Sequence, residues 1–194
     1  MNTVRGFSLI ELVVGLVILG ILMSIAIPVY TDWLRNMRVR TAAESFQNGM
    51  QLARAEAVRR NTRVGLYLVT TVDGTCALNT AGPSWAVSLL DPSGLCDQAA
   101  VDAGGPPNPG IIQVRNAAEG ATSTTIAGAQ SSFVFNSLGR LTTGAATQID
   151  VSSSTGAACL AGGGPVRCLR IAVSVGGQVR MCDPALPAAD TQAC

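Results

Sequence analysis

The chain has 194 residues, enough for one domain of ordinary size and an accessory segment. It contains 13 arginines and 12 acidic residues but no lysine and no histidine, and its formal net charge is +1. Without lysine it cannot form a phosphate-binding P-loop. Without histidine it lacks the usual base of a nucleophilic triad and the commonest zinc and iron ligand. We therefore expect no enzyme, no catalytic residue, no cofactor and no metal site.

The amino-terminal segment is strongly apolar. Leu12–Ile27 carry no charge, and Phe7–Ile10 extend the run upstream to about 21 residues. At about 1.5 Å per residue, a helix of this length spans the roughly 30 Å hydrocarbon core of a bilayer. Glu11 interrupts the run, and an ionised carboxylate in lipid is costly unless it finds a partner. A secretory signal peptide fits poorly, because Arg5 is the only basic residue in front and no small-residue cleavage site follows.

The helical pattern continues past Pro28 to about Asn61. Its apolar residues recur at steps of three and four, and this stripe predicts packing against the following domain. The stripe consists of Val39, Ala42, Phe46, Met50, Ala53 and Ala57. The charged residues Arg38, Glu44, Arg54 and Arg59 lie largely off the stripe, so we expect them to face solvent or neighbouring subunits. Residues 28–61 carry a net charge of +3, whereas residues 62–194 carry −2.

Beyond Asn61 the pattern changes to a period of two, which is typical of strands. The expected strands are Arg63–Thr71, Trp85–Leu90, Ile111–Arg115, Thr124–Ala127, Ser132–Phe135, Gln148–Val151, Cys168–Val175 and Gln178–Cys182. Gly176 and Gly177 between the last two predict a hairpin, and Asn136–Gly139 predicts a second turn. Residues 91–110 and 152–165 predict long loops. The expected fold class is α+β, with a long amino-terminal helix, transmembrane and then amphipathic, packed on an antiparallel sheet.

Six cysteines follow residue 75 and none precedes it. They are Cys76, Cys96, Cys159, Cys168, Cys182 and Cys194. No two form a CxxC pair, so disulfides in an oxidising compartment are favoured over a zinc site, with buried free thiols as the alternative. Six cysteines allow 15 pairings. We favour nearest neighbours: Cys76–Cys96, Cys159–Cys168 and Cys182–Cys194.

The residues Arg5-Gly6-Phe7-Ser8-Leu9-Ile10-Glu11 resemble the leader and processing site of type IV pilins and type II secretion pseudopilins. The resemblance implies that prepilin peptidase cleaves between Gly6 and Phe7 and that Phe7 is then N-methylated. It also implies that Glu11 of one subunit pairs with the terminal amine of a neighbour during assembly. An unpaired Glu11 that reaches the headgroups is the alternative. Pro28 matches the proline at which such helices commonly bend.

Later segments narrow the resemblance to the GspH/FimT group. Gln51–Arg60 resembles its "ARSEA" helix segment, Phe135–Arg140 its "F-x-x-x-G" turn, and Leu169–Cys182 its closing hairpin. Members are minor subunits of type IV pili (FimT- or FimU-like) or of the type II secretion pseudopilus (GspH-like), and are thought to prime or cap the filament near its tip.

This resemblance predicts four parts and a set of partners. Residues 1–6 form a cleaved leader, 7–27 a transmembrane assembly helix, 28–61 its amphipathic continuation and 62–194 a periplasmic β-rich domain. The expected partners are other minor and major pilins or pseudopilins, prepilin peptidase and the inner membrane. The positive-inside rule favours a cytoplasmic location for residues 62–194 instead, since Arg35, Arg38 and Arg40 follow the apolar run. The cysteines and the leader motif favour the periplasmic side of the membrane for this domain.

DNA capture is the alternative function, because some FimT-like relatives bind DNA through a basic G-R-x-R motif. Here the matching stretch is Gly177-Gln178-Val179-Arg180, with glutamine in place of the first arginine. The net charge of −2 on residues 62–194 weakens non-specific attraction to DNA. The candidate DNA contacts are Arg140, Arg167, Arg170 and Arg180. Asp91, Asp97 and Asp102 form a solvated acidic loop, with calcium binding as an alternative.

Overall fold

One long helix supplies the surface on which the rest of the chain is built. The structure, a computed structural model, describes residues 8–98, 108–117, 119 and 122–194. It divides into two compact units, Met1–Leu34 and Arg35–Cys194, and each is described by itself. The helix α1 extends over Leu9–Arg60, so its first part belongs to one unit and its last part to the other.

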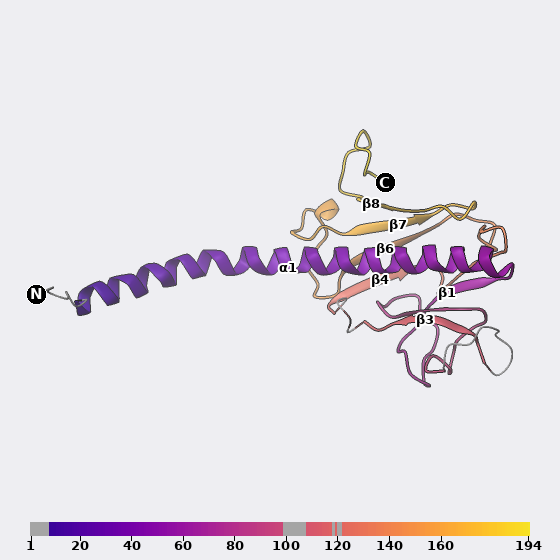
Figure 1. The fold of residues 1–194 in the computed structure, drawn as a ribbon. Helices are drawn as coiled ribbons and strands as arrows, with labels where there is room; N and C mark the ends of the chain where they lie inside the picture. Colours follow the sequence, from indigo (N-terminus) through magenta and orange to yellow (C-terminus); the bar gives the residue numbers. More distant parts are fainter. Residues whose placement is uncertain (1–7, 99–107, 118, 120–121) are drawn as a thin grey trace, which may run out of the picture. The chain divides into compact units, whose positions relative to one another are not determined.

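Among its described residues, the second unit adds eight strands and one short 3₁₀ helix to the end of α1 (Figure 1). The strands are β1 (Val64–Leu68), β2 (Trp85–Ser88), β3 (Ile111–Arg115), β4 (Thr124–Gly128), β5 (Ser132–Phe135), β6 (Thr147–Ser153), β7 (Leu169–Val173) and β8 (Val179–Cys182). The 3₁₀ helix η1 covers Leu160–Gly162. This arrangement confirms the expected α+β class and all eight expected strands, with ends that differ by a few residues.

The strands form two antiparallel sheets rather than the single sheet that was expected. The first sheet has the order β3-β2-β1-β5 and the second the order β4-β6-β7-β8. Neighbouring strands pair antiparallel throughout, for example with Leu66 opposite Val87 and Phe133 in the first sheet. The sequence cannot show this division, because strand periodicity reports which face is buried and not which strand pairs with which.

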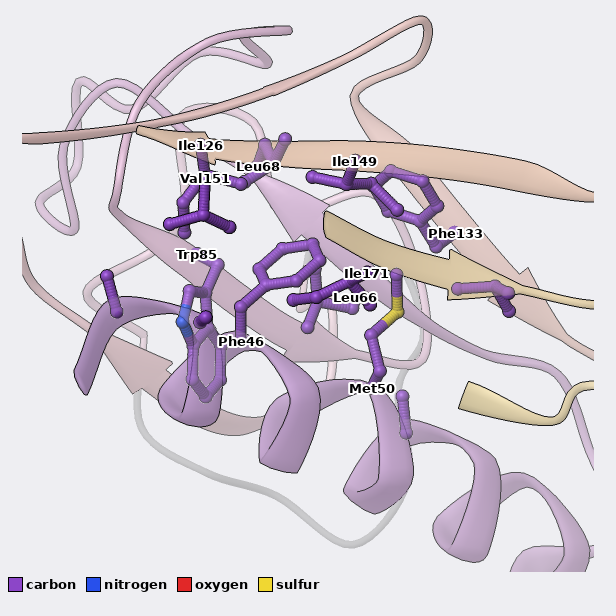
Figure 2. Close-up of a cluster of buried hydrophobic side chains, with 14 of the residues drawn as sticks. Phe46, Met50, Leu66, Leu68, Trp85, Ile126, Phe133, Ile149, Val151 and Ile171 are labelled. Atoms are coloured by element: carbon purple, nitrogen blue, oxygen red, sulfur yellow. The ribbon is translucent and has the colours of Figure 1, made fainter. Parts of the chain in front are cut away.

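The hydrophobic core lies between α1 and the two sheets. All six residues of the predicted stripe are at most 1% exposed, which confirms the stripe as core. Phe46 and Met50 point from the helix toward side chains of both sheets (Figure 2). The rings of Phe46 and Phe133 meet edge to face at 5.9 Å, a geometry that the ring quadrupoles favour. The helix therefore holds the two sheets together through one apolar face.

The strand β1 is buried on both faces, unlike the half-buried strand that a period of two describes. Its five residues are all buried. Leu66 faces the main core, whereas Tyr67 belongs to a second cluster with Val69 and the disulfide-bonded pair Cys76 and Cys96. The loop that carries Cys76 and Cys96 therefore contributes to the cover over the outer face of the first sheet.

The helix ends at Arg60 through a left-handed cap. Asn61 has a φ of 52°, a conformation that asparagine tolerates better than most side chains. The amide of Thr62 donates to the Ala57 carbonyl at 3.2 Å, and the amide of Asn61 donates to the Val58 carbonyl at 3.3 Å. These two bonds form a Schellman motif, which satisfies carbonyls that the end of a helix leaves free.

Two similar turns lie against each other near the end of α1. In both, a left-handed glycine closes a three-residue loop: Gly139 lies between Asn136 and Arg140, and Gly177 between Ser174 and Gln178. The second turn is thus longer than the two-glycine hairpin that the sequence predicts. The carbonyl of Gly139 accepts a 3.1 Å hydrogen bond from Arg54 Nε, so Arg54 contacts the domain as well as solvent.

The predicted loop at residues 152–165 also needs correction. Strand β6 continues to Ser153, and η1 interrupts the remainder of the segment. Short helical turns of this kind have no apolar period that a sequence pattern could reveal.

Replacing Phe46 with alanine tests the role of the helix face. We expect a loss of about 3–5 kcal/mol in the free energy of unfolding, because a fully buried aromatic ring is removed from between the sheets. Denaturant titration of the full chain in detergent measures the loss, with both this variant and its control made in a Trp33→Phe background so that Trp85 is the fluorescent reporter. Leu138, which is 74% exposed, provides the control, since Leu138→Ala should change stability by no more than about 0.5 kcal/mol.

Substituting Gly177 with alanine tests the contact between the two turns. A Cβ at this position would lie 1.8 Å from the Gly139 carbonyl oxygen, in addition to the cost of about 1–2 kcal/mol for a left-handed side chain. Gly156 is the matched control, with a φ of 76° and no atom within 4 Å of the added Cβ. Gly177→Ala should therefore lower the denaturation midpoint clearly more than Gly156→Ala, and equal effects would contradict the contact.

Candidate functional site: the amino-terminal helix and the domain arginines

The described part of the chain begins at the cap of α1. The hydroxyl oxygen of Ser8 accepts a 3.3 Å hydrogen bond from the amide of Glu11, and the Ser8 carbonyl accepts one from Leu12. Serine at the cap with glutamate three residues later is the sequence pattern of a capping box. The carboxylate of Glu11 thus lies in the first turn, where the helix dipole favours a negative charge. Gly6 and Phe7 lie outside the described residues.

The first half of α1 exposes apolar side chains around its whole circumference. Every large apolar residue from Leu12 to Ile27 is between 45% and 65% exposed. This helix is long and apolar enough to cross a membrane, and its most apolar stretch has a mean hydropathy of 2.8. An apolar helix with no polar face cannot be stable in water on its own. It therefore requires lipid, or other chains, around it.

Glu11 is the acidic group within this apolar surface. Among the described residues, which start at Ser8, no cation forms an ion pair with it. The helix runs through Pro28 without interruption. Because proline has no amide hydrogen, the Ser24 carbonyl loses its helical donor there. Whether the helix bends at Pro28, as the family resemblance implies, stays a prediction.

The four predicted DNA-contacting arginines lie on different parts of the second unit, and two are already paired. Arg170 on β7 donates to Asp150 on β6 at 2.6 Å, and this hydrogen bond raises the pKa of Arg170 above its ordinary value. Arg167 pairs with Asp183, whose side chain is 3% exposed. These two cations are therefore neutralised within the subunit.

Arg140 and Arg180 have no ion pair within the part of the chain that the structure describes. Arg140 closes the Asn136 turn, and its backbone amide donates to the Asn136 side chain at 3.0 Å. Arg180 lies on the edge strand β8, opposite Ala172 of β7. Two unpaired cations give a weaker attraction to phosphates than the four that the sequence suggests.

The structure joins the cysteines in the nearest-neighbour pairs that the sequence favours: Cys76–Cys96, Cys159–Cys168 and Cys182–Cys194. No cysteine is free. The disulfides span 20, 9 and 12 residues, so each stabilises a local segment.

No cluster of three metal-ligating side chains occurs among the described residues. Asp91 instead accepts hydrogen bonds from the Ser93 amide and hydroxyl, at 2.9 and 2.6 Å. Asp97 lies beside Gly74. Asp102 falls outside the described residues.

Sequence reasoning missed a groove of about 530 Å³ beside the start of the domain part of α1. Its walls come from α1, η1, β7, β8 and the carboxyl-terminal segment, and they include Met37, Leu160 and Met181. The side chain of Asn36 accepts a 2.7 Å hydrogen bond from the Arg167 amide at this groove. These residues belong to separate segments with no shared motif, so no signal in the sequence could assemble them.

Comparison with known proteins identifies the family. The model of the type II transport protein GspH matches residues 42–177, which is well over half of the chain. The chain belongs to the GspH family. The model of the prokaryotic N-terminal methylation motif matches residues 1–27, the region of the capped helix start and of the apolar run.

Curated relatives of this GspH-family chain include a type IV fimbrial protein and a pilin-like protein. The type IV major fimbrial protein FimA of Dichelobacter nodosus is 31% identical over an alignment of 104 positions, and the match covers 46% of this chain and 62% of FimA. The pilin-like protein PilA1 of Thermus thermophilus is 40% identical over 68 residues, which are 35% of this chain and 42% of PilA1. The chain thus matches about three fifths or less of the length of these relatives.

Two solved structures were compared with the chain. The type IV minor pilin FimU of Pseudomonas aeruginosa superposes with a TM-score of 0.51 at 14% identity, over 80% of this chain and 94% of FimU. The minor pseudopilin EpsH from the type 2 secretion system of Vibrio cholerae matches with a TM-score of 0.44 at 13% identity, over 77% and 99% of the two chains. The likeness to FimU confirms the pilin-like fold of this GspH-family chain.

Removing individual disulfides from the GspH domain tests how each contributes. We expect loss of Cys76–Cys96 to cost about 2–4 kcal/mol of unfolding free energy. Its closed loop is longer than that of Cys159–Cys168, which makes its entropic contribution about 0.7 kcal/mol larger. Both of its cysteines are also buried in the second apolar cluster. Paired alanine substitutions, compared by denaturant titration, should rank Cys76–Cys96 above Cys159–Cys168, and the reverse order would contradict this account.

Proposed function

We propose that this GspH-family protein is a minor subunit of an envelope filament, either a type IV pilus or a type II secretion pseudopilus. In this proposal residues 7–27 hold the subunit in the inner membrane, with the domain on the periplasmic side. The subunit then enters the filament near its tip, where it primes or caps assembly. Its partners are other minor and major pilins or pseudopilins.

The observation that carries this proposal is the uncovered apolar half of α1 with Glu11 at its start. An assembled filament supplies what the isolated subunit lacks, because neighbouring helices cover apolar side chains and a neighbouring amine can pair with the carboxylate. Paired in this way, the desolvation cost of Glu11 is offset, whereas an unpaired carboxylate in a low-dielectric environment is unfavourable. The Glu11 carboxylate therefore favours assembly over the monomeric subunit.

Cleavage of the leader would create the amine, as the new amino terminus at Phe7. The match to the N-terminal methylation motif over residues 1–27 supports cleavage by prepilin peptidase between Gly6 and Phe7 and N-methylation of Phe7. Cleavage places a positive group four residues before Glu11 in the sequence, at the membrane surface. Pro28, at the end of the apolar run, is proposed as the point at which the helix adapts its direction to the filament.

Neutralising Glu11 tests the pairing. We expect Glu11→Gln to insert into the inner membrane normally, because a charge has been removed from an apolar helix, but to enter filaments several-fold less than the wild type. Quantitative immunoblotting of sheared filaments and of membranes measures both. Glu44→Gln is the control. Glu44 is an exposed acid on the same helix, and its carboxylate pairs with Arg40 at 2.8 Å. Normal incorporation of the Glu11 variant would refute the pairing.

A clean deletion, scored in one strain for surface pili, DNA uptake and secreted exoenzymes, tests the function as a whole. Loss of pili with normal secretion is expected for a pilus subunit, and loss of secretion with normal pili for a pseudopilin. Loss of DNA uptake with normal pili and normal secretion would instead support DNA capture as the function. A strain normal in all three assays would refute the proposal.

A further inference from the structure

We propose that Tyr30 and Trp33 form an aromatic anchor that binds the lipid–water boundary on the periplasmic side of the bilayer. This anchor sets the depth at which the unassembled subunit sits. The inference rests on the proposed function, since it takes residues 7–27 to span the inner membrane. Its partner is a lipid surface, recognised through the glycerol and headgroup layer.

The two rings form one exposed surface. Their centroids lie 6.0 Å apart and their planes are 26° from parallel, and a spacing of three residues places them on one side of the helix. Tyr30 is 59% exposed and Trp33 is 56% exposed. The other tryptophan, Trp85, is 2% exposed in the core. The structure thus leaves a large aromatic pair uncovered just after the apolar run.

The chemistry of the pair fits a boundary rather than either phase. A phenol and an indole each combine a broad apolar ring with one polar group, the hydroxyl and the Nε1–H. Among the described residues, neither polar group forms a hydrogen bond with the protein. Ester carbonyls of the glycerol layer, phosphates and water satisfy such groups at a membrane surface while acyl chains cover the rings, which is why tyrosine and tryptophan concentrate there.

The position of the pair along the helix fits the thickness of a bilayer. Glu11 and Asp32 are consecutive charged residues in the sequence, and everything between them is uncharged. The rise from Glu11 to Tyr30 is about 28 Å at 1.5 Å per residue, close to the roughly 30 Å of a hydrocarbon core. With the Glu11 carboxylate at the inner boundary, the aromatic pair therefore reaches the outer one.

An anchor at one end of a helix also fixes the other end. Because α1 is helical without a break from Leu9 to Trp33, the depth of Tyr30 and Trp33 sets the depth of Glu11. An aliphatic pair would not prefer the boundary, so the flanking charges of Glu11 and Asp32 would bound the depth of the helix without fixing it. The aromatic pair thereby keeps Glu11 at a level where a neighbour's amine can reach it.

Depth-dependent fluorescence quenching of the full chain in vesicles tests the anchor. The vesicles contain phosphatidylethanolamine and phosphatidylglycerol, with bromine placed either near the headgroup end or near the methyl end of the acyl chains. The Trp33 signal is the difference between the wild type and Trp33→Phe, in which Trp85 remains as a buried reference. We expect shallow bromines to quench the Trp33 signal several-fold more strongly than deep ones.

A second probe measures whether the pair sets the depth. Leu22→Trp, combined with Trp33→Phe, reports the centre of the apolar run, where deep bromines should quench more. A chain that instead combines Leu22→Trp with Tyr30→Leu and Trp33→Leu has neither ring, so the depth of this probe should shift or broaden. The control chain carries Leu22→Trp and Trp33→Phe together with Val29→Leu and Ile25→Leu, so that positions 30 and 33 remain aromatic. It is the matched control and should leave the depth unchanged.

Three results would overturn the anchor. The first is quenching of Trp33 mainly by deep bromines, which places it in the hydrocarbon core. The second is quenching by aqueous acrylamide without quenching by lipid bromines, which places it in water. The third is protection from acrylamide and from lipid bromines, which indicates that a neighbouring subunit covers Trp33. Resistance of the chain to carbonate extraction separates these results from failure of the proposed function. A chain that does not insert refutes the membrane span and the anchor together, whereas an inserted chain with Trp33 away from the boundary refutes the anchor alone.

Discussion

The packing of one face of α1 against two sheets is the interaction on which the domain depends. Phe46 and Met50 enter the space between the sheets, and the alanines on the same face allow the strands to approach closely. The small size of Gly49 serves the same purpose, since an added Cβ would lie 2.9 Å from both Leu66 and Trp85. Side chains of both sheets therefore meet the helix in one buried cluster.

The first half of α1 shows the opposite behaviour, although it belongs to the same continuous helix. It is apolar on all sides, so the stripe that directs Val39–Ala57 into the core has no counterpart before Pro28. A surface of this kind has to be covered by lipid or by other helices. Glu11 adds a second requirement, because its carboxylate favours a covering environment that also supplies a cation. The features on which the proposal of a membrane-held, assembling subunit rests therefore lie in the first half of one helix.

The domain itself uses its charge and its cysteines for local structure. Arg167 and Arg170 pair with acids of their own subunit, and Arg54 fixes the Gly139 turn that lies against Gly177. The disulfides close local segments, and Cys76–Cys96 also contributes to a second apolar cluster. Arginines that look available for DNA in the sequence therefore have structural roles in two of four cases.

Much of the fold was accessible from the sequence, because it depends on local patterns. The steps of three and four that end at Ala57 identified the buried face of α1, and strand periodicity located all eight strands. The nearest-neighbour disulfides also agree, since short separations keep such cysteines close. The amino-terminal motif indicated the type IV pilins and pseudopilins, and the later segments narrowed the resemblance to the GspH/FimT group.

Only the tertiary structure decided how these elements combine. The division into two sheets, the burial of both faces of β1 and the contact between the Gly139 and Gly177 turns all join residues far apart in the sequence. The pairing of Arg167 with Asp183, and of Arg170 with Asp150, depends in the same way on strand register and on the return of the carboxyl-terminal segment. The sequence by itself determined what each segment prefers, since those preferences act over a few residues. Which segments satisfy one another is decided by packing in three dimensions, which no local pattern records.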